Sequence, residues 1–324
     1  MIILTGGAGF IGSGVLRLLN DRGKFEVLVV DHLGKDEKWK NLVGKRFLDY
    51  IHKDQFLEQL LGGAFGEGNE VEAVVHLGAC SSTTETDADY LYRNNFKYSQ
   101  LVATWCLEKG VRFVYASSAA TYGDGSKGFL DDDAALRHLR PMNMYGYSKQ
   151  LFDEWALDEG LLDKVVGLKF FNVFGPNEAH KGDMRSLVDK AVAQILSQGR
   201  LKLFKSARPD VADGEQTRDF IYVKDAAAVV LKLLDDRHVG GLYNLGSGSA
   251  HTWNQLAAAV FSALGRPVAI EYVDMPENLR DKYQYHTRAE MGKLRQAVGL
   301  LPIRSLDDAV KDYVQNHLLP DQRW

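Results

Sequence analysis

Short apolar runs alternate with segments of helical periodicity along the first half of the chain. Residues 1–4 form an apolar run, a glycine-rich turn follows, and apolar residues then recur every four positions at Ile11, Val15 and Leu19. That spacing indicates a helix. The continuous apolar run 27–30 predicts a strand of a parallel sheet that is covered on both faces. Together these elements predict a βαβ unit.

The same alternation continues to about residue 171. We expect further strands at 73–76, 113–116 and 165–171, and helices at about 87–110 and 145–160. Strands that alternate with helices are typical of a doubly wound parallel sheet. The sequence therefore predicts an α/β fold.

The second half of the chain has a different pattern. Long polar connections at about 177–184 and 206–218 separate short apolar pieces such as 243–245 and 268–273. Loops of that length in a compact protein are typically binding loops or lids. We therefore expect a smaller, interleaved substrate domain. The predicted boundaries are 1–172 for a dinucleotide-binding domain, with 215–245 packing on it, and 173–214 with 246–324 for the substrate-binding domain.

Composition narrows the class of protein. The chain has 324 residues, which predicts about two domains at roughly 100–200 residues each. Its 39 basic and 43 acidic residues give a formal net charge of −4, which excludes the strongly basic surface of a nucleic-acid-binding protein. Cys80 and Cys106 are the only cysteines, so we expect neither a disulfide framework nor a metal site. A reducing, cytoplasmic location is expected, because the sequence has no membrane-length apolar run and no secretion signal at its start.

Residues 5–12, Thr-Gly-Gly-Ala-Gly-Phe-Ile-Gly, lie between the first expected strand and helix. Gly6, Gly9 and Gly12 allow a tight turn, a close approach of the backbone to a pyrophosphate and close packing of helix on strand. The N-terminus of the helix attracts the phosphates. Asp31 closes the second strand 19 positions after Gly12. This context favours a dinucleotide site over a simple glycine-rich turn with a surface acid.

The acid and its neighbours favour different cofactors. Asp31 predicts a hydrogen bond to a ribose 2′-hydroxyl and thus NAD. Several basic residues follow Asp31 in the sequence. The 2′-phosphate of NADP requires cationic donors of this kind. Surface lysines can also simply form a solvated patch. The basic residues are His32, Lys35, Lys38 and Lys53. The residues alone leave NAD and NADP open.

A tyrosine and a lysine four positions apart form the second candidate group. At helical spacing Tyr145 and Lys149 share one face, so the ammonium lies near the phenol. The pKa of a tyrosine is about 10, and nearby positive charge favours the phenolate, which is a usable base. Ser118, which follows an expected strand, supplies a hydroxyl that orients the reacting oxygen. The pattern is common on ordinary helix faces, and the upstream dinucleotide turn is what favours catalysis.

Longer stretches of the chain are similar to a known family. They are 78–85 (Gly-Ala-Cys-Ser-Ser-Thr-Thr-Glu), 116–123 (Ala-Ser-Ser-Ala-Ala-Thr-Tyr-Gly), 171–176 (Phe-Asn-Val-Phe-Gly-Pro) with the following His180-Lys181-Gly182, and 218–223 (Arg-Asp-Phe-Ile-Tyr-Val). Together with the glycine turn and the Ser/Tyr/Lys group, they resemble the extended short-chain dehydrogenase/reductases that act on nucleotide sugars. Within that family, they closely resemble the ADP-glyceromanno-heptose 6-epimerases, over nearly the whole chain.

The resemblance implies an isomerase with a Rossmann-type cofactor domain and a smaller substrate domain. It implies epimerisation at C6″ of ADP-D-glycero-β-D-manno-heptose to the L-glycero form, through transient oxidation to a 6-keto sugar. The cofactor it implies is tightly bound NADP, with NAD as the alternative, and the pathway is that of the lipopolysaccharide core heptose. It also implies a cytoplasmic homo-oligomer, a pentamer, that takes a small-molecule ADP-sugar and binds neither nucleic acid nor membrane.

The resemblance also assigns roles to individual residues around the cofactor. Phe10 and Ile11 would contact the pyrophosphate, and the residues near Asp31 would surround the adenosine ribose. The cofactor-binding residues that it implies are Gly6, Gly9, Phe10, Ile11, Gly12, Asp31, His32, Lys38, Lys53, Leu77, Gly78, Ala79, Cys80, Ser81, Asn94, Asn95, Tyr145, Lys149, Val173 and Lys181.

Lys181 acquires its meaning from the resemblance, because its spacing alone would make it an ordinary loop lysine. The family places it as a second base that faces Tyr145 across the sugar. The substrate-binding residues implied are Ser118, Asn172, Asp183, Lys190, Phe204, Lys205, Ser206, Arg218 and Tyr283. The chain departs from the family in a longer segment 207–216, and in having charged Asp183 and Lys190 where an uncharged residue and a histidine are more usual.

Three other functions fit parts of this pattern. A dehydratase of the same family typically has Asp-Glu after the serine, and here Ala119 and Ala120 follow Ser118. A UDP-sugar 4-epimerase would share Ser118 and the Tyr/Lys pair, and only the Lys181 loop and the Cys80 segment argue against it. A cofactor-binding regulator without catalysis is the third alternative, and the intact catalytic group argues against it.

Overall fold

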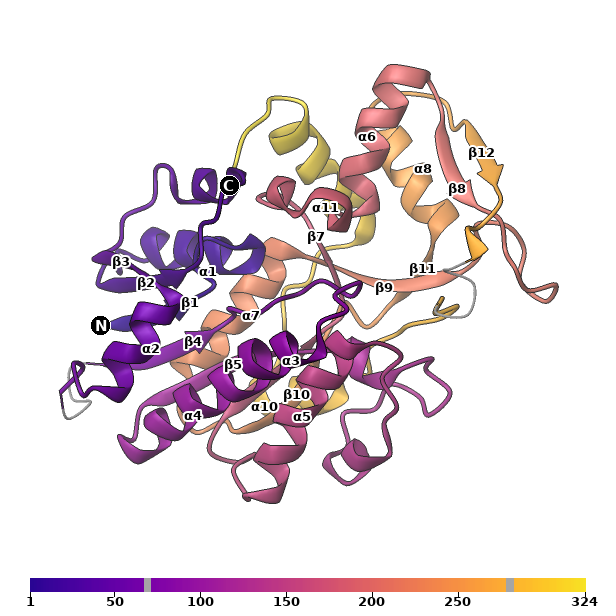
Figure 1. The fold of residues 1–324 in the computed structure, drawn as a ribbon. Coiled ribbons are helices and arrows are strands. Elements are labelled where there is room, and N and C mark those ends of the chain that lie inside the picture. Colours follow the sequence, from indigo (N-terminus) through magenta and orange to yellow (C-terminus); the bar gives the residue numbers. More distant parts are fainter. Residues whose placement is uncertain (67–70, 278–282) are drawn as a thin grey trace.

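A seven-stranded parallel sheet forms the centre of the molecule (Figure 1). The computed structural model describes residues 1–66, 71–277 and 283–324. The order of the strands is β10-β6-β5-β4-β1-β2-β3, and all six pairings are parallel. Their bounds are β1 Ile2–Thr5, β2 Val27–Asp31, β3 Asp49–His52, β4 Ala73–His76, β5 Arg112–Ser118, β6 Val166–Phe170 and β10 Gly241–Leu245.

Helices cover both faces of this sheet. On one face α1 packs against α7, and on the other α2 packs against α4 while α5 packs against β5 and η2. These helices are α1 Phe10–Asp21, α2 Lys53–Leu61, α3 Ala88–Leu91, α4 Tyr98–Glu108, α5 Met144–Asp158, α7 Val223–Asp235 and α10 Gly292–Val298. The predicted doubly wound α/β fold is confirmed.

The strand order reverses between β1 and β4, so that the loops after these neighbouring strands diverge. Thr5, at the end of β1, lies beside Val30 of β2 and His76 of β4 in the register of the sheet. In open α/β sheets ligands bind outside the carboxyl ends of the strands at this switch point. The glycine turn that follows Thr5 is therefore at the position where a dinucleotide binds in such folds.

A second group of elements lies to one side of the sheet (Figure 1). The short sheet β11-β9-β7 and the parallel pair β8–β12 pack with three helices around a second cluster of buried apolar residues. Phe10, the first residue of α1, belongs to this second cluster and so joins it to the dinucleotide turn. The elements are β7 Asn172–Phe174, β8 Leu201–Phe204, β9 Thr217–Tyr222, β11 Ala250–Thr252, β12 Ile270–Val273, α6 Leu187–Gln198, α8 Trp253–Ala263 and α11 Leu306–Tyr313.

The structure refines several of the expected elements. The helix expected at 87–110 is a helical run in which a π-helical turn, η2 (Tyr92–Lys97), separates α3 from α4. The polar connection 177–184 contains the 3₁₀ segment η5 (Ala179–Met184), and the strand expected at 268–273 begins at Ile270. The other short 3₁₀ or π segments are η1 Glu37–Leu42, η3 Ala119–Tyr122, η4 Asp133–His138 and η6 Val314–Leu318. Within the described ranges, no helix combines the length and apolar character needed to cross a bilayer.

Candidate active site

The turn between β1 and α1 leaves no room for a side chain at Gly6 or Gly12. Gly6 has a φ of +70°, and a Cβ at Gly12 would lie 2.0 Å from the carbonyl oxygen of Gly6. No side chain caps α1 at Gly9, so the amides of its first turn remain available to an anion. A pocket lined by these glycines, Phe10 and Ile11 opens at this helix end. The geometry therefore fits a pyrophosphate.

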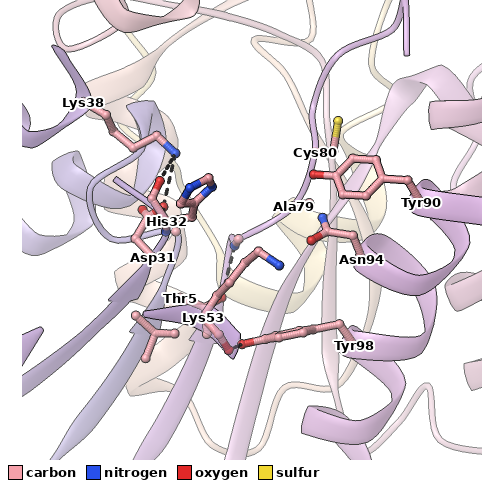
Figure 2. Close-up of a pocket in the computed structure, with 13 residues that line it drawn as sticks. Thr5, Asp31, His32, Lys38, Lys53, Ala79, Cys80, Tyr90, Asn94 and Tyr98 are labelled. Atoms are coloured by element: carbon pink, nitrogen blue, oxygen red, sulfur yellow. Dashed lines mark hydrogen bonds and ion pairs between the residues drawn. The ribbon is translucent and has the colours of Figure 1, made fainter. Parts of the chain in front are cut away.

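Asp31 faces the turn from the end of β2. Its Oδ2 accepts a hydrogen bond from the amide of Ala8 at 2.9 Å, and its Oδ1 accepts from the amide of His32 at 2.7 Å and from Lys38 Nζ at 3.2 Å. Lys38 also donates to the carbonyl oxygen of His32. Figure 2 shows this group on one wall of the pocket. Asp31 is thus already engaged by the turn and by a cation.

The opposite wall of the same pocket comes from the helical run after residue 87. Tyr90, Asn94 and Tyr98 line it, and Lys53 and Cys80 complete the rim (Figure 2). The Tyr98 hydroxyl donates to the main-chain oxygen of Lys53 at 2.9 Å, which links this wall to the start of α2. The pocket has cationic side chains at Lys38 and Lys53 on its rim.

Two of the expected cofactor residues lie outside this lining. Asn95 is buried, and its side-chain amide exchanges two hydrogen bonds with the backbone of Cys80 and donates to Ser148 Oγ. It therefore holds the Cys80 segment against α5. Val173, in β7, packs against the apolar cores. The other expected cofactor residues line one or both of the two pockets, which share Gly6, Asp31, Lys38, Gly78 and Ala79; they are Gly6, Gly9, Phe10, Ile11, Gly12, Asp31, His32, Lys38, Lys53, Leu77, Gly78, Ala79, Cys80, Ser81, Asn94, Tyr145, Lys149 and Lys181.

Tyr145 and Lys149 lie one turn apart near the start of α5 and face the pocket. Asn143 caps this helix by accepting from the amide of Gly146 at 2.8 Å. Desolvation raises the pKa of the Tyr145 phenol, while hydrogen bonding with Ser118 acts in the opposite direction. Burial lowers the pKa of Lys149 to about 8, and its ammonium donates to the main-chain oxygen of Ala116 at 2.7 Å. Ser118 is buried at the end of β5 and contacts the Tyr145 phenol, but it is not among the residues that line this pocket.

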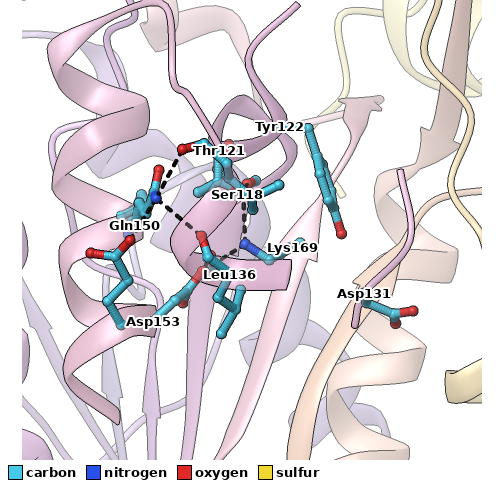
Figure 3. A network of polar contacts seen from close by, with 12 residues as sticks. Ser118, Thr121, Tyr122, Asp131, Leu136, Gln150, Asp153 and Lys169 are labelled. Carbon is cyan, nitrogen blue, oxygen red and sulfur yellow. Dashed lines mark hydrogen bonds and ion pairs between the residues drawn. The ribbon is translucent and has the colours of Figure 1, made fainter. Parts of the chain in front are cut away.

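A buried polar network of Thr121, Lys169 and Asp153 holds the backbone of Ser118 (Figure 3). The hydroxyl of Thr121 donates to the main-chain oxygen of Ser118 at 2.9 Å, and Lys169 Nζ donates to Thr121 Oγ1 and to Asp153 Oδ2, each at 2.7 Å. Asp153 also accepts from Tyr115 and Ser117. Since Asp153 is one turn beyond Lys149 on α5, the network ties the catalytic helix to β5 and β6.

Lys181 is the one expected catalytic residue that comes from the second half of the chain. It lies in η5 and lines the same pocket as Tyr145 and Lys149, with its Nζ 5.1 Å from the centre of the Phe10 ring. Burial lowers the pKa of its ammonium, and Glu178 raises it by a smaller amount. The structure therefore brings the two expected bases into one cavity.

The expected substrate residues are more dispersed. Lys190 Nζ donates to the main-chain oxygen of Asp183 at 2.6 Å, so these two residues lie together beside η5, while Asn172 is exposed at the start of β7. Phe204 ends β8, and Lys205 and Ser206 line a separate hollow next to it. None of these six residues is among those that line the pocket of Tyr145, Lys149 and Lys181.

Arg218 lies on β9 and is buried between two aromatic rings. Its guanidinium carbon is 5.7 Å from the centre of the Trp253 ring and 5.0 Å from that of Tyr283, and Trp253 Nε1 donates to the Tyr283 hydroxyl at 2.7 Å. Burial lowers the pKa of this guanidinium. In the part of the chain that the structure describes, no carboxylate forms an ion pair with Arg218. A buried cation without a counter-charge is suited to an anionic ligand such as a diphosphate.

Sequence reasoning missed several lining residues. His180 precedes Lys181 and lines the pocket between the turn and Tyr145. Tyr90 and Tyr98 were detectable, because with Asn94 they are spaced four residues apart and so share one face of a helix. Thr5 also lines the adenosine end of the cavity.

Comparisons with known proteins identify the family of the chain. Residues 2–246 match the model of the NAD dependent epimerase/dehydratase family. The chain is 56% identical over 318 residues to ADP-L-glycero-D-manno-heptose-6-epimerase of Nitratidesulfovibrio vulgaris, covering 98% of both chains, and 44% identical over 333 residues to the same-named protein of Fusobacterium nucleatum, covering all of both. The crystal structure of Helicobacter pylori ADP-L-glycero-D-manno-heptose-6-epimerase is 26% identical, with a TM-score of 0.82 over 97% of this chain and 95% of that one. With this match over most of its length, the chain belongs to the NAD dependent epimerase/dehydratase family.

Proposed function

We propose that the chain epimerises ADP-D-glycero-β-D-manno-heptose at C6″ to the L-glycero form. The observation that carries this proposal is the placement of Lys181 in one cavity with Tyr145, Lys149 and the dinucleotide turn. The two epimers present the C6″ hydroxyl on opposite sides, and Tyr145 and Lys181 supply one proton-transfer group for each of them. The whole-length similarity to proteins named as epimerases of this sugar supports the choice of substrate.

In this mechanism one of the two bases removes the proton of the 6″-hydroxyl, and the other returns a proton after the sugar has presented its opposite face. Ser118 holds the reacting oxygen, and the positive charge of Lys149 favours the phenolate of Tyr145. The pocket lined by Gly6, Phe10 and Tyr145 would hold a nicotinamide cofactor, which would supply reversible hydride transfer at C6″, a chemistry that no protein side chain offers. Arg218, whose guanidinium lies between the rings of Trp253 and Tyr283, binds the diphosphate of the substrate.

For the cofactor we propose NADP, with NAD as the alternative. Asp31 is engaged by the amide of Ala8 and by Lys38, which leaves it a poor partner for a ribose 2′-hydroxyl. Lys38 and Lys53 at the rim of the same pocket supply cations for a 2′-phosphate. Mass spectrometry of the cofactor released on denaturation identifies it directly.

We further propose the division into two domains and assembly into a homo-oligomer. The proposed division is a cofactor domain over 1–172 and 215–245 and a substrate domain over 173–214 and 246–324. Two clusters of buried apolar residues support a division into two domains, although apolar residues of 289–298, which includes α10, pack in the first cluster, and Phe220, Tyr222 and Val223 pack in the second. Light scattering coupled to size-exclusion chromatography measures the number of chains in the particle, with a pentamer as the expected result.

The test of the function is direct conversion of the purified sugar nucleotide. We expect epimerisation without added cofactor, without net formation of reduced nicotinamide, and without deuterium at C6″ when the reaction runs in heavy water. UDP-glucose and UDP-galactose serve as comparison substrates. If the protein converts these preferentially, its substrate is a UDP-hexose and not the ADP-heptose. Deuterium at C6″ would show that the carbon exchanges its proton with solvent and would contradict transient oxidation.

A further inference from the structure

Asn177 lies at the start of the loop that carries Lys181 and has an unusual backbone conformation. Its φ is +76°, one of two positive values at non-glycine residues in the described ranges. Asparagine tolerates this left-handed region better than most residues, and the conformation turns the chain between Pro176 and Glu178. The amide of Lys181 then donates to the carbonyl oxygen of Glu178 at 2.9 Å. The direction of the chain at Asn177 therefore sets the position of the first turn of η5.

The side chain of Asn177 is buried and satisfied from two distant segments. Its Nδ2 donates to Ser13 Oγ of α1 and to the main-chain oxygen of Trp324, each at 3.0 Å. Its Oδ1 accepts from the amide of Trp324 at 2.9 Å. One asparagine thus joins the loop, the helix of the dinucleotide turn and the last residue of the described chain.

A second buried asparagine, Asn41 in η1, completes the connection. Its Nδ2 lies 3.0 Å from the carbonyl oxygens of both Ala8 and Asn177 and 3.3 Å from His180 Nδ1. Its Oδ1 accepts from Arg323. The glycine turn, the Lys181 loop and residues 323–324 therefore meet at two side-chain amides.

The ring of Trp324 fixes the tail against α1. A Cβ at Gly14 would lie 2.7 Å from this ring, so that only glycine leaves space for it. Lys224 Nζ lies 5.5 Å from the ring centre and Lys45 Nζ donates to the main-chain oxygen of Trp324. The tail is thus held by packing as well as by hydrogen bonds.

We propose that Asn177 is a positioning residue that, clamped by Trp324 and Asn41, holds η5 so that Lys181 faces Tyr145 across the substrate. This inference rests on the role proposed above for Lys181. Asn177, Asn41 and Trp324 are not among the residues that line the two pockets, so their effect on the reaction would pass through the placement of the Lys181 ammonium. A catalytic group displaced by about 1 Å can cost on the order of 100-fold in rate.

The test compares Asn177→Gly, Trp324→Ala and Trp324→Phe in the full chain as purified. Asn177→Gly retains access to positive φ and loses only the side-chain bonds, and Trp324→Phe keeps the backbone bonds and an aromatic ring. Gln322→Ala is the matched control, because in the described part of the chain the tail residue Gln322 makes its hydrogen bonds through its backbone.

We expect Asn177→Gly and Trp324→Ala to lower kcat at least tenfold, with less than a threefold change in KM for the ADP-sugar. Trp324→Phe should restore most of kcat, and Gln322→Ala should match the parent. If Asn177→Gly impairs folding, Trp324→Ala still tests the proposal, because it removes only the ring that packs on α1 and leaves the backbone of Trp324 in place. Equal kcat in all variants would overturn the proposal.

A second readout does not depend on activity. Competitive acetylation followed by mass spectrometry gives the pH midpoint of Lys181 reactivity, with exposed Lys232 as the internal reference. The charged and titratable side chains that surround Lys181 are Asp31, Lys38, Tyr145, Lys149, Glu178 and His180. Loosening η5 admits water to the Lys181 ammonium, so its pH midpoint should rise in Asn177→Gly and Trp324→Ala.

The two readouts separate the two proposals. Suppose that the parent protein does not epimerise the heptose, but the pH midpoint of Lys181 rises in Asn177→Gly and Trp324→Ala. This result would support the positioning of Lys181 and reject the proposed function. An active parent whose variants show neither a raised midpoint nor a lower kcat would retain the function and reject the positioning role.

Discussion

Lys169 Nζ lies 2.7 Å from Oδ2 of Asp153, and neither side chain is exposed to solvent. A charge buried in this way is tolerated only with its partner, and removing one member costs about 3–5 kcal/mol. Lys169→Met should therefore lower the free energy of unfolding in urea by about that amount. The double variant Lys169→Met/Asp153→Asn removes both charges. It keeps one acceptor oxygen for Tyr115 or Ser117, and the other hydroxyl can accept from the new amide NH2, so the double variant should be more stable than the single variant.

The same comparison decides whether charge or packing dominates at this position. If the double variant is no more stable than Lys169→Met, the loss comes from the shape of the side chains and not from an uncompensated carboxylate.

Tyr145→Phe should lower turnover by about 100- to 10,000-fold, the range that general acid–base catalysis typically contributes. The phenyl ring retains the packing, so the bound nicotinamide cofactor should remain, and its absorbance in the purified protein measures this. Tyr147→Phe is the control, because Tyr147 is exposed and lies two residues further along α5, away from the face of Tyr145. Unchanged turnover in Tyr145→Phe would remove this residue from the role of base.

The cofactor end of the site was largely predictable from the sequence, because its parts are local. The turn at Gly6 and Gly12 and the acid Asp31 belong to one βαβ unit, and Tyr145 and Lys149 share one helix turn. Their spacing along the chain therefore carries their arrangement in space.

The substrate end depends on contacts between distant segments, which the spacing of residues does not encode. Lys181 lies in a loop that begins at Asn177, and Asn177 bonds to Asn41 and Trp324, which are 283 positions apart in the sequence. Arg218 stacks on Trp253 and Tyr283 and has no ion-pair partner among the described residues, which the pattern around it did not indicate. Tertiary packing decides both features.

The stability of the cofactor-free protein should depend on pH through Lys149. Burial lowers its pKa to about 8 in the folded state, whereas an unfolded lysine keeps a pKa near 10.5. Between these values the unfolded state holds more protons, so the cost of burying Lys149 is present below pH 8 and disappears as the pH rises toward 10.5. The difference in unfolding free energy between the parent and Lys149→Met should therefore shift in favour of the parent by about 2 kcal/mol from pH 7.5 to 10.

Lys45, whose pKa burial also lowers to about 8, is present in both proteins and cancels in this difference. A difference that stays constant with pH would mean that the Lys149 ammonium is not desolvated in the folded chain.

Lys38→Ala should change the choice between cofactors. The variant removes a cation from the rim of the adenosine pocket and frees Asp31 Oδ1 to accept from a ribose 2′-hydroxyl. The Kd for NADP should rise about tenfold relative to that for NAD, measured by fluorescence quenching with the cofactor-free protein. Lys35→Ala is the control, since Lys35 lies outside this pocket. Parallel changes in both affinities would show that Lys38 does not read the 2′-phosphate.

Arg218→Met should make the protein more stable and less able to bind its substrate. Burial of a guanidinium that pairs with no carboxylate of residues 1–66, 71–277 or 283–324 costs free energy in the ligand-free fold, and the stacking on Trp253 and Tyr283 offsets only part of that cost. Methionine fills a similar volume without the charge, so the free energy of unfolding should rise by about 1–3 kcal/mol.

The same substitution removes charge-assisted hydrogen bonds to a diphosphate, each worth about 1.5–3 kcal/mol, so the Kd for ADP should rise about 10- to 100-fold. Calorimetric titration with ADP and urea unfolding measure the two effects on one preparation. Arg237→Met, at an exposed arginine that pairs with Glu72, should change neither. Because the two effects have opposite signs, a variant that loses both stability and ADP affinity would indicate a structural role for Arg218, whereas a gain of stability with weaker binding identifies a cation that the fold retains for its ligand.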